Sequence, residues 1–292
     1  MKFVLIPGSR NYHTETEKLV EIGGKYFETS IQAPFPEIKT VVHRDERAVI
    51  HAEENLCDFD AVYTRTSSQD VDYAPIILDI LVDSGVYSPI QPDAITVSKN
   101  KFYTLKVMAE CGLPTPKAVL ITSPKIVEKI KNDFNFPVVV KLLGSMGGKG
   151  VMMVSSPSDF GPIIDAMDRL NQIVAVEEFI KNPGEDHRLF VIGDEVAASM
   201  KRQSVKEGEF RANITIGGKP NVYEPSEEEK EIALKAAEAI GMEICGVDLV
   251  PGENGPLLIE LNDGPSFKGI STVAGMDLRD KAIQYIHKQA KA

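Results

Sequence analysis

A lysine followed by a run of glycines stands where a buried strand would give way to a loop. Residues 138–140 are three valines, whose β-branched side chains favour a strand over a helix. Lys141 comes next, and a buried lysine at the end of a strand usually meets an anion. The glycines can take positive φ and lack a Cβ, so successive backbone N–H groups can close around phosphate oxygens. The segment therefore predicts a phosphate-binding loop that contains Gly144, Gly147, Gly148 and Gly150.

Two better-known phosphate-binding patterns do not fit this loop. A P-loop requires Ser or Thr after its Gly-Lys pair and a glycine five residues earlier. Here Gly150 follows Gly148 and Lys149, and Leu143 holds the earlier position. The chain also has no G-x-G-x-x-G sequence. From the loop alone, a surface hairpin with a flexible tip is an equal alternative, because glycine clusters often mark turns.

A second group of residues with chemical potential lies in two short apolar runs near the C-terminus. Residues 246–250 and 256–262 are separated by a loop that contains an Asn-Gly pair, which predicts a β-hairpin. Asp248 interrupts the first run, while Glu260 and Asn262 lie two apart on the second and share a face. Carboxylate and amide oxygens suit Mg²⁺, so the three residues predict a metal site. The alternative is that Asp248 and Glu260 are exposed charges on edge strands.

These segments together resemble the ATP-grasp superfamily, and within it the ligases typified by the ribosomal-protein glutamate ligase RimK. Each short piece is weak alone, but their order and spacing span nearly the whole chain. The resemblance implies an α/β (α+β) fold of three lobes, with ATP bound between the central and C-terminal lobes. The pieces that carry it are residues 59–65, 98–101, 112–116, 138–142, 176–180, 186–188, 206–213, 246–248 and 260–262.

The resemblance also implies which residues hold the nucleotide. Lys101 and Lys141 match the paired lysines that bind its phosphates, and the loop with Ser145 matches the segment that closes over them. Glu185 or Asp186 would meet the ribose hydroxyls. The backbone that meets the adenine edge would be that of Glu177, Glu178, Phe179 and Ile180.

The remaining roles implied by the resemblance concern the transferred phosphate and the metal. Arg211 and Asn213 match polar residues that face the phosphate, and Arg188 and Arg202 match arginines that neutralise phosphate or a substrate carboxylate. The Mg²⁺ ligands, which could also bind Mn²⁺, would be Asp248, Glu260 and Asn262.

The chain departs from the family in two segments near the expected acceptor. The family often has Asn-x-Ser-Pro-Gly after the last metal ligand, whereas this chain has Asp263-Gly264-Pro265-Ser266-Phe267 after Asn262. Its glycine loop, with Met146 and Lys149, also differs from the commoner Glu-Gly-Thr-Gln-Gly form. The identity of the substrate is therefore the part of the resemblance that transfers least safely.

The activity that the resemblance implies is an ATP-dependent, ADP-forming ligation of a carboxylate to an amine. Such an enzyme would join an amino acid, L-glutamate first among candidates, to the C-terminal carboxylate of a protein, peptide or peptide-like cofactor. Two alternatives are an ATP-grasp kinase of a polyol and a nucleotide-binding regulatory protein without turnover. Similar enzymes are dimers or tetramers, so a homo-oligomer is expected.

The elements around these motifs predict three lobes without a long linker. We expect an N-terminal α/β, pre-ATP-grasp lobe over residues 1–97, a central lobe over 98–176 and a C-terminal lobe over 177–292. A helix should run from Ser98 to Cys111, and another should start at Ser158. Ser226 and Glu229 predict a capping box for a helix that ends at Gly241. In the first lobe, Arg65, Asp70 and Asp72 could touch substrate, although capping and surface roles are favoured.

Composition agrees with an enzyme of this kind. The 292 residues include 43 acidic and 32 basic ones, and the net charge of −11 argues against a nucleic-acid surface. No apolar run is long enough to cross a bilayer, and Pro7-Gly8 interrupts the apolar start before a signal peptide could develop. Three widely spaced cysteines favour a reducing cytoplasm and argue against a catalytic cysteine.

Overall fold

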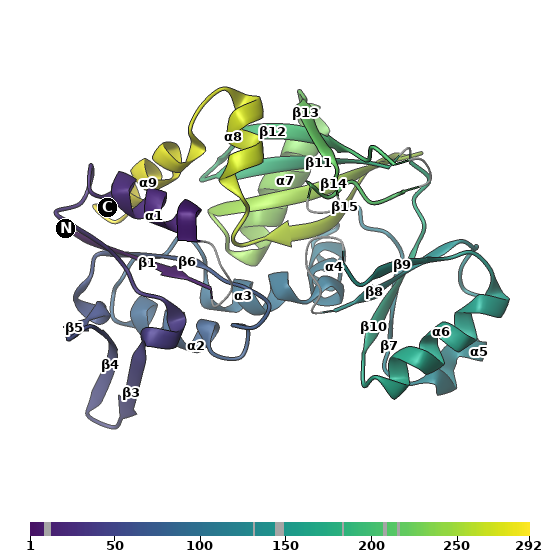
Figure 1. Cartoon of the computed structure of the whole chain (residues 1–292), viewed down its shortest axis with the longest axis horizontal. Helices are drawn as coiled ribbons and strands as arrows, with labels where there is room; N and C mark the ends of the chain where they lie inside the picture. The colour runs from purple at the N-terminus through teal and green to yellow at the C-terminus, as the bar shows by residue number, and fades with distance from the viewer. Residues whose placement is uncertain (9–12, 131, 144–148, 183, 207–208, 215–216) are drawn as a thin grey trace.

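The computed structural model describes residues 1–8, 13–130, 132–143, 149–182, 184–206, 209–214 and 217–292, and the strands of this part form four sheets. Figure 1 shows three lobes: the first and last residues lie together at the left, and the central lobe lies at the right. The mixed α/β class expected from the sequence is confirmed. Among the described residues, no helix combines the length and apolar character that a membrane crossing requires.

The N-terminal lobe is built on a parallel sheet of strand order β2-β1-β6. The strands are short; β1 is buried from Phe3 to Pro7, and every residue of β6 is buried. An antiparallel sheet, β3-β4-β5, extends from this lobe at the lower left of Figure 1. The elements are β1 (Lys2–Pro7), α1 (His13–Gly23), β2 (Thr29–Gln32), β3 (Lys39–His43), β4 (Glu46–His51), β5 (Glu54–Asn55), β6 (Ala61–Arg65), α2 (Ala74–Asp83) and α3 (Pro92–Lys99), with 3₁₀ turns at Phe35–Glu37 and Leu56–Asp58.

The helix expected from Ser98 to Cys111 is two helices in the structure. Helix α3 ends at Lys99, and α4 (Lys101–Glu110) begins two residues later. Asn100 separates them because its backbone is extended and its side-chain oxygen accepts a hydrogen bond from the Tyr103 N–H at 3.0 Å. Asparagine competes for the backbone in this way and favours caps over helix interiors. The break places Lys101 at the first position of α4.

The central lobe is an antiparallel sheet of order β7-β10-β8-β9 with helices on one side. The strand predicted at residues 138–140 is β8, and Lys141 lies within it as its fourth residue. Helix α6 starts earlier than expected, because Ser156 provides the cap and Pro157 occupies the first turn. The elements are β7 (Ala118–Ile121), α5 (Val127–Ile130), β8 (Val138–Leu142), β9 (Val151–Val154), α6 (Pro157–Arg169) and β10 (Val174–Glu178), with a 3₁₀ turn at Pro124–Ile126.

The C-terminal lobe is an antiparallel sheet of order β13-β12-β11-β14-β15. The predicted hairpin is confirmed as β14 and β15, and the predicted capping box of Ser226 and Glu229 is present at the start of α7. Gly241 ends that helix with φ +81°, in the left-handed region. The elements are β11 (Glu185–Ile192), β12 (Glu195–Gln203), β13 (Lys219–Val222), α7 (Glu227–Ile240), β14 (Ile244–Gly252), β15 (Gly255–Asn262), α8 (Phe267–Ala274) and α9 (Leu278–Gln289).

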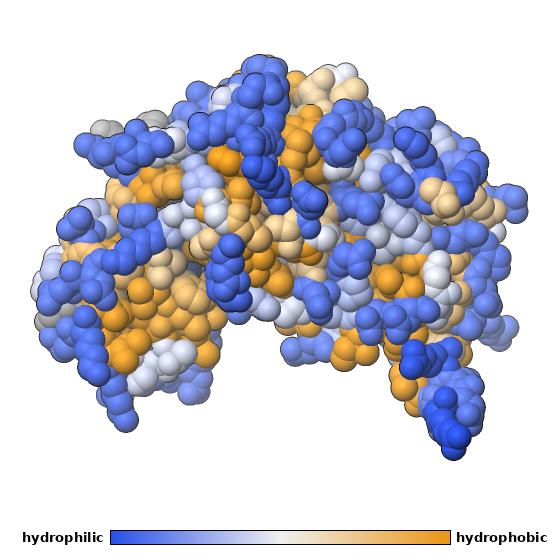
Figure 2. All heavy atoms as spheres, turned by 180° about the vertical axis from the view of Figure 1, so that it is seen from behind, coloured by the Kyte–Doolittle hydropathy of each residue, from blue (hydrophilic) through white to orange (hydrophobic). Residues whose placement is uncertain are grey.

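The described residues form two hydrophobic cores. The larger core runs without interruption from the first lobe into the third, and α9 lies against α1, where the Tyr26 hydroxyl donates to Asp280 at 2.9 Å. The central lobe has a separate core between its sheet and α6, with Phe160 and Val140 inside it. Figure 2 shows the surface from behind, with polar residues mainly at its edges, apolar areas at the left and in the middle, and a hollow between the central lobe and the rest. We retain boundaries near residues 97 and 176 as a proposal.

Candidate active site

A cleft where the central and C-terminal lobes face each other collects most of the residues singled out in the sequence. Its volume is about 840 Å³, including the space at its open mouth. Strands β8 and β10 line one side, and β11, β12, β14 and β15 line the other. The predicted site residues that line it are Lys101, Lys141, Glu177, Glu178, Phe179, Ile180, Glu185, Asp186, Arg202, Arg211, Asn213, Asp248 and Glu260.

Six of the predicted residues are not among those that line the cleft. Arg188 does not line the cleft itself but donates a hydrogen bond to Asp248, which does. Asn262 lies at the end of β15, opposite Gly246. The other four are outside the described residues, and they are Gly144, Ser145, Gly147 and Gly148.

The acidic hairpin places Asp248 and Glu260 directly opposite each other on β14 and β15. Asp248 is fully buried, and its two oxygens accept hydrogen bonds from Arg188 Nε and Nη2, both at 2.6 Å. Arg202 Nη2 adds a third bond at 2.9 Å. Glu260 is partly exposed and lies 3.4 Å from the Lys101 ammonium. Asp248 is therefore not an exposed edge-strand charge, which was the alternative left open by the sequence, whereas Glu260 lies on the edge strand β15 and is paired with Lys101.

The two candidates for the ribose hydroxyls are both engaged by side chains of the C-terminal lobe. Asp186 accepts hydrogen bonds from Arg202 Nε at 2.5 Å and Nη2 at 2.8 Å. Glu185 accepts from His187 at 3.0 Å and lies 3.3 Å from the Lys201 ammonium. A ribose would therefore have to share either carboxylate with these partners.

The central-lobe side of the cleft carries one buried ion pair. Lys141 Nζ lies 2.6 Å from Glu177 Oε2, and only 12% and 3% of the two side chains are exposed. The other oxygen, Glu177 Oε1, is buried and has no hydrogen-bond partner among the described residues. A buried acceptor without a partner is costly unless a ligand satisfies it. The pair thus presents a cation and an open acceptor to whatever enters the cleft.

Arg211 stands at the wall of the cleft and is fixed by its neighbour Glu209. The guanidinium donates to both carboxylate oxygens, at 2.8 and 2.7 Å, and this bond lowers the pKa of Glu209 to about 2. Between them Phe210 packs edge-on against Phe179, with ring centroids 5.9 Å apart. Phe210 was missed in the sequence, although it is the only aromatic residue between Phe190 and Tyr223 and interrupts a polar segment.

The three predicted metal ligands, Asp248, Glu260 and Asn262, suit Mg²⁺ better than a metal ion whose ligands must all come from the protein. No group of three or more His, Cys, Asp or Glu side chains with metal-binding geometry occurs in the described part of the chain. The set offers two carboxylates and one amide, and Mg²⁺ completes such a shell with water and substrate phosphates. The Asn262 amide nitrogen is buried without a partner among the described residues. Since the two ends of an amide are assigned by their partners, the Asn262 oxygen can point toward a cation.

The three lobes and the cleft have the arrangement expected of an ATP-grasp protein, and the comparison with known proteins assigns the family. The RimK-like ATP-grasp domain matches residues 98–286, so the chain belongs to the RimK-like ATP-grasp family, as the sequence motifs indicated. The chain is therefore an enzyme of the ligase class, and ligases with this fold use ATP.

Individual relatives agree with this assignment. The chain is 37% identical to a probable alpha-L-glutamate ligase of Legionella pneumophila over 238 residues, which cover 81% of this chain and 78% of that protein. A RimK-domain ATP-grasp protein from Sphaerobacter thermophilus superposes with a TM-score of 0.74 at 16% identity, covering 98% and 99% of the two chains. The ATP-grasp ligase PsnB, solved with a minimal precursor, Mg and ADP, superposes at 0.72 with 19% identity, covering 99% and 97%.

Acid should remove the stabilisation that the Asp248 carboxylate provides. Burial disfavours its charged form, but Arg188 and Arg202 outweigh burial and lower the pKa of Asp248 to about 2, below the ordinary range of an aspartate. A carboxyl with a lowered folded-state pKa adds stability above its unfolded pKa and loses it as pH falls to the folded value. The free energy of unfolding of Asp248→Asn should therefore lie below that of the parent at neutral pH. In urea unfolding, this difference should narrow between about pH 4 and about pH 2.

Asp83→Asn is the control for this measurement. Asp83 is exposed and pairs with Arg47 at 3.4 Å, so its replacement should change stability little at any pH. A difference between Asp248→Asn and the parent that stayed constant down to pH 2 would contradict the role of the two arginines.

Proposed function

We propose that the protein joins an amino acid, with L-glutamate the first candidate, to the C-terminal carboxylate of a protein, peptide or peptide-like cofactor. The observation that carries this proposal is the convergence in one cleft of two lysines, two arginines and six carboxylates, among them the opposed pair Asp248 and Glu260. The Legionella pneumophila relative supports glutamate by its name, and the PsnB complex supports a peptide acceptor by its precursor.

The central-lobe side of the cleft would hold the nucleotide. The Lys141 ammonium, which is paired with Glu177, would bind phosphate oxygens. Lys101 would bind the same phosphates from the start of α4. Lysine binds phosphate as a compact charge with three donors. The open oxygen of Glu177 would accept from the adenine amino group, with Phe179 and Phe210 beside the ring.

The opposite side of the cleft would hold the metal. Asp248, Glu260 and Asn262 would bind Mg²⁺, which would neutralise phosphate charge when bound. Arg188 and Arg202 hold the Asp248 carboxylate in place from behind, so its orientation is set before a ligand arrives. The presence of Mg and ADP in the PsnB complex supports this assignment.

The chemistry proceeds in two displacements. A carboxylate oxygen of the acceptor attacks the terminal phosphorus of ATP, the bond to the bridging oxygen breaks, and ADP leaves. The resulting acyl phosphate has a good leaving group, so the nitrogen of an amine attacks the acyl carbon, phosphate leaves and the amine loses a proton. No enzyme nucleophile is required. Arg211, Asn213 and the lysines would act by positioning the reactants and neutralising charge.

A screen for ADP release tests the proposed reaction. The protein with ATP and Mg²⁺ is offered single amino acids together with peptides that end in a free carboxylate, and the peptide mass is then measured. We expect ADP release that depends on both substrates and a peptide mass gain of one or more amino acid residues. Phosphorylation of a polyol without an amine would identify a kinase. Nucleotide binding without ADP release in any combination would identify a regulatory protein.

A further inference from the structure

The segment that directly follows Asn262 is held by polar groups from the first hundred residues of the chain. Asp263 is buried and accepts hydrogen bonds from the Lys99 ammonium and the Thr66 hydroxyl. Lys99 also donates to the Thr66 carbonyl at 3.0 Å, so the three groups form a closed network. Two neighbours of Asp263, Gly264 and Ser266, are positions at which the chain departs from the family sequence.

Arg65 holds the next part of the segment. It lies at the end of β6 with a side chain that is 1% exposed, and its Nη2 donates to the Pro265 carbonyl at 2.9 Å. The same nitrogen donates to Glu15 Oε2 at 3.0 Å. The guanidinium also lies over the Phe267 ring, 5.1 Å from its centroid. The N-terminal lobe thus contacts the segment through charge, hydrogen bonds and an aromatic face.

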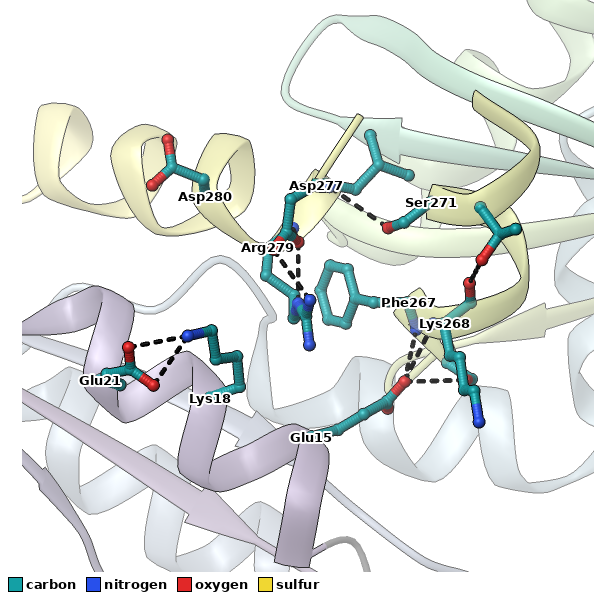
Figure 3. Close-up of polar contacts among 12 residues, drawn as sticks. Glu15, Lys18, Glu21, Phe267, Lys268, Ser271, Asp277, Arg279 and Asp280 are labelled. Atoms are coloured by element: carbon teal, nitrogen blue, oxygen red, sulfur yellow. Dashed lines mark hydrogen bonds and ion pairs between the residues drawn. The ribbon is translucent and has the colours of Figure 1, made fainter. Parts of the chain in front are cut away.

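Glu15 completes the contact by capping α8 from a distance of some 250 residues along the chain, as Figure 3 shows. Its Oε1 accepts from the backbone N–H groups of Phe267 and Lys268, both at 3.0 Å, and from the Ser266 hydroxyl at 2.8 Å. Ser266 itself makes no side-chain cap. Because the first N–H groups of a helix lack partners within it, a carboxylate there fixes where the helix begins.

The segment is packed against the predicted metal site. A methyl group on Gly246 would lie 3.0 Å from Pro265 Cβ and 3.7 Å from Arg188 Nε. Gly246 lies opposite Asn262 in the sheet and two residues before Asp248. Pro265 therefore covers the floor of the site between Asn262 and the arginine that holds Asp248. A shift of residues 263–267 would move Asn262 or open this floor.

We propose that Glu15 and Arg65 are positioning residues that fix Asn262 for metal–nucleotide binding. They touch no reactant; they act through Pro265, Ser266 and the start of α8. The inference rests on the proposed function, because it takes Asn262 as a metal ligand. Partners behind a metal ligand typically change metal affinity or activity by about 10- to 100-fold when they are replaced.

Glu15→Gln tests this inference, because it keeps one acceptor oxygen for α8 and removes the charge that pairs with Arg65. Mn²⁺ binding is measured by electron paramagnetic resonance with a non-hydrolysable ATP analogue, together with kcat and KM for ATP. We expect Mn²⁺ affinity and kcat to fall about 10- to 100-fold. Metal-free binding of the analogue, which depends on the central lobe, should stay within about twofold of the parent.

Glu21→Gln is the matched control, since Glu21 lies on the same helix in an exposed pair with Lys18 at 2.7 Å (Figure 3). It should leave both readouts unchanged. Ser266→Ala is a second variant, which removes one hydrogen bond to Glu15 without removing a charge. It should reduce Mn²⁺ affinity by a smaller factor than Glu15→Gln does. It tests the inference even if Glu15→Gln does not fold. If both variants had a lower melting temperature but parental Mn²⁺ affinity and kcat, Glu15 would stabilise the fold without positioning Asn262, and the inference would be wrong. Because Mn²⁺ binding needs no acceptor, this result is independent of whether the ligation itself is found.

Discussion

Glu260→Gln should reduce kcat by roughly three orders of magnitude, or about 4 kcal/mol of transition-state stabilisation. The change keeps the shape of the side chain and removes one of two carboxylate ligands from the proposed Mg²⁺ site. Glu260 is partly exposed, and the amide that replaces it can still accept a hydrogen bond from Lys101, which lies 3.4 Å away. The fold should therefore survive. Turnover is measured as ADP release over a range of Mg²⁺ concentrations, with the melting temperature recorded alongside.

Glu253→Gln is the control for this variant, because Glu253 lies in the turn of the same hairpin and is exposed. It should have parental turnover. A Glu260→Gln protein with near-parental kcat at low as well as high Mg²⁺ would show that the metal does not bind at this carboxylate.

Lys141→Met should raise the dissociation constant for ATP about 100-fold, which corresponds to about 3 kcal/mol. Charge-assisted hydrogen bonds to phosphate are among the stronger polar contacts, and Lys141 offers one from a nearly buried position. Part of the loss would arise from Glu177, whose buried carboxylate would lose its partner. Calorimetric titration with ATP measures the change.

A second substitution separates these two causes. Lys141→Met combined with Glu177→Gln removes the unpaired buried charge, so any affinity recovered relative to the single variant belongs to Glu177. Lys129→Met, at an exposed position on α5, serves as the control and should bind ATP normally. Parental ATP affinity in Lys141→Met would rule out the contact between this lysine and phosphate.

Local features of the fold followed from the sequence because their causes are local. The hairpin of β14 and β15 is marked by its turn residues, and the start of α7 by Ser226 and Glu229, which bond to each other. The ATP-grasp family followed from short motifs in a fixed order. The break at Asn100 was missed because helical residues precede and follow it. In such a sequence, a residue that caps a helix cannot be told from a polar residue inside one.

Contacts between distant segments could not be predicted in the same way. The bonds from Arg188 and Arg202 to Asp248 join three strands, and Glu15 reaches α8 across most of the chain. Nothing in the spacing of these residues indicates which carboxylate meets which guanidinium, because strand pairing and lobe packing decide it. Residue types therefore predicted most of the side chains that line the candidate cleft, whereas tertiary structure decided the partners of these side chains.

The two separate cores have a consequence for how substrates enter. In the part of the chain that the structure describes, the cleft wall with Lys141 is anchored in the central lobe's own core, while the wall with Asp248 belongs to the core common to the other two lobes. A hinge motion between these walls would leave both cores packed. We therefore expect such a motion to vary the width of the cleft and to admit acceptors of different size.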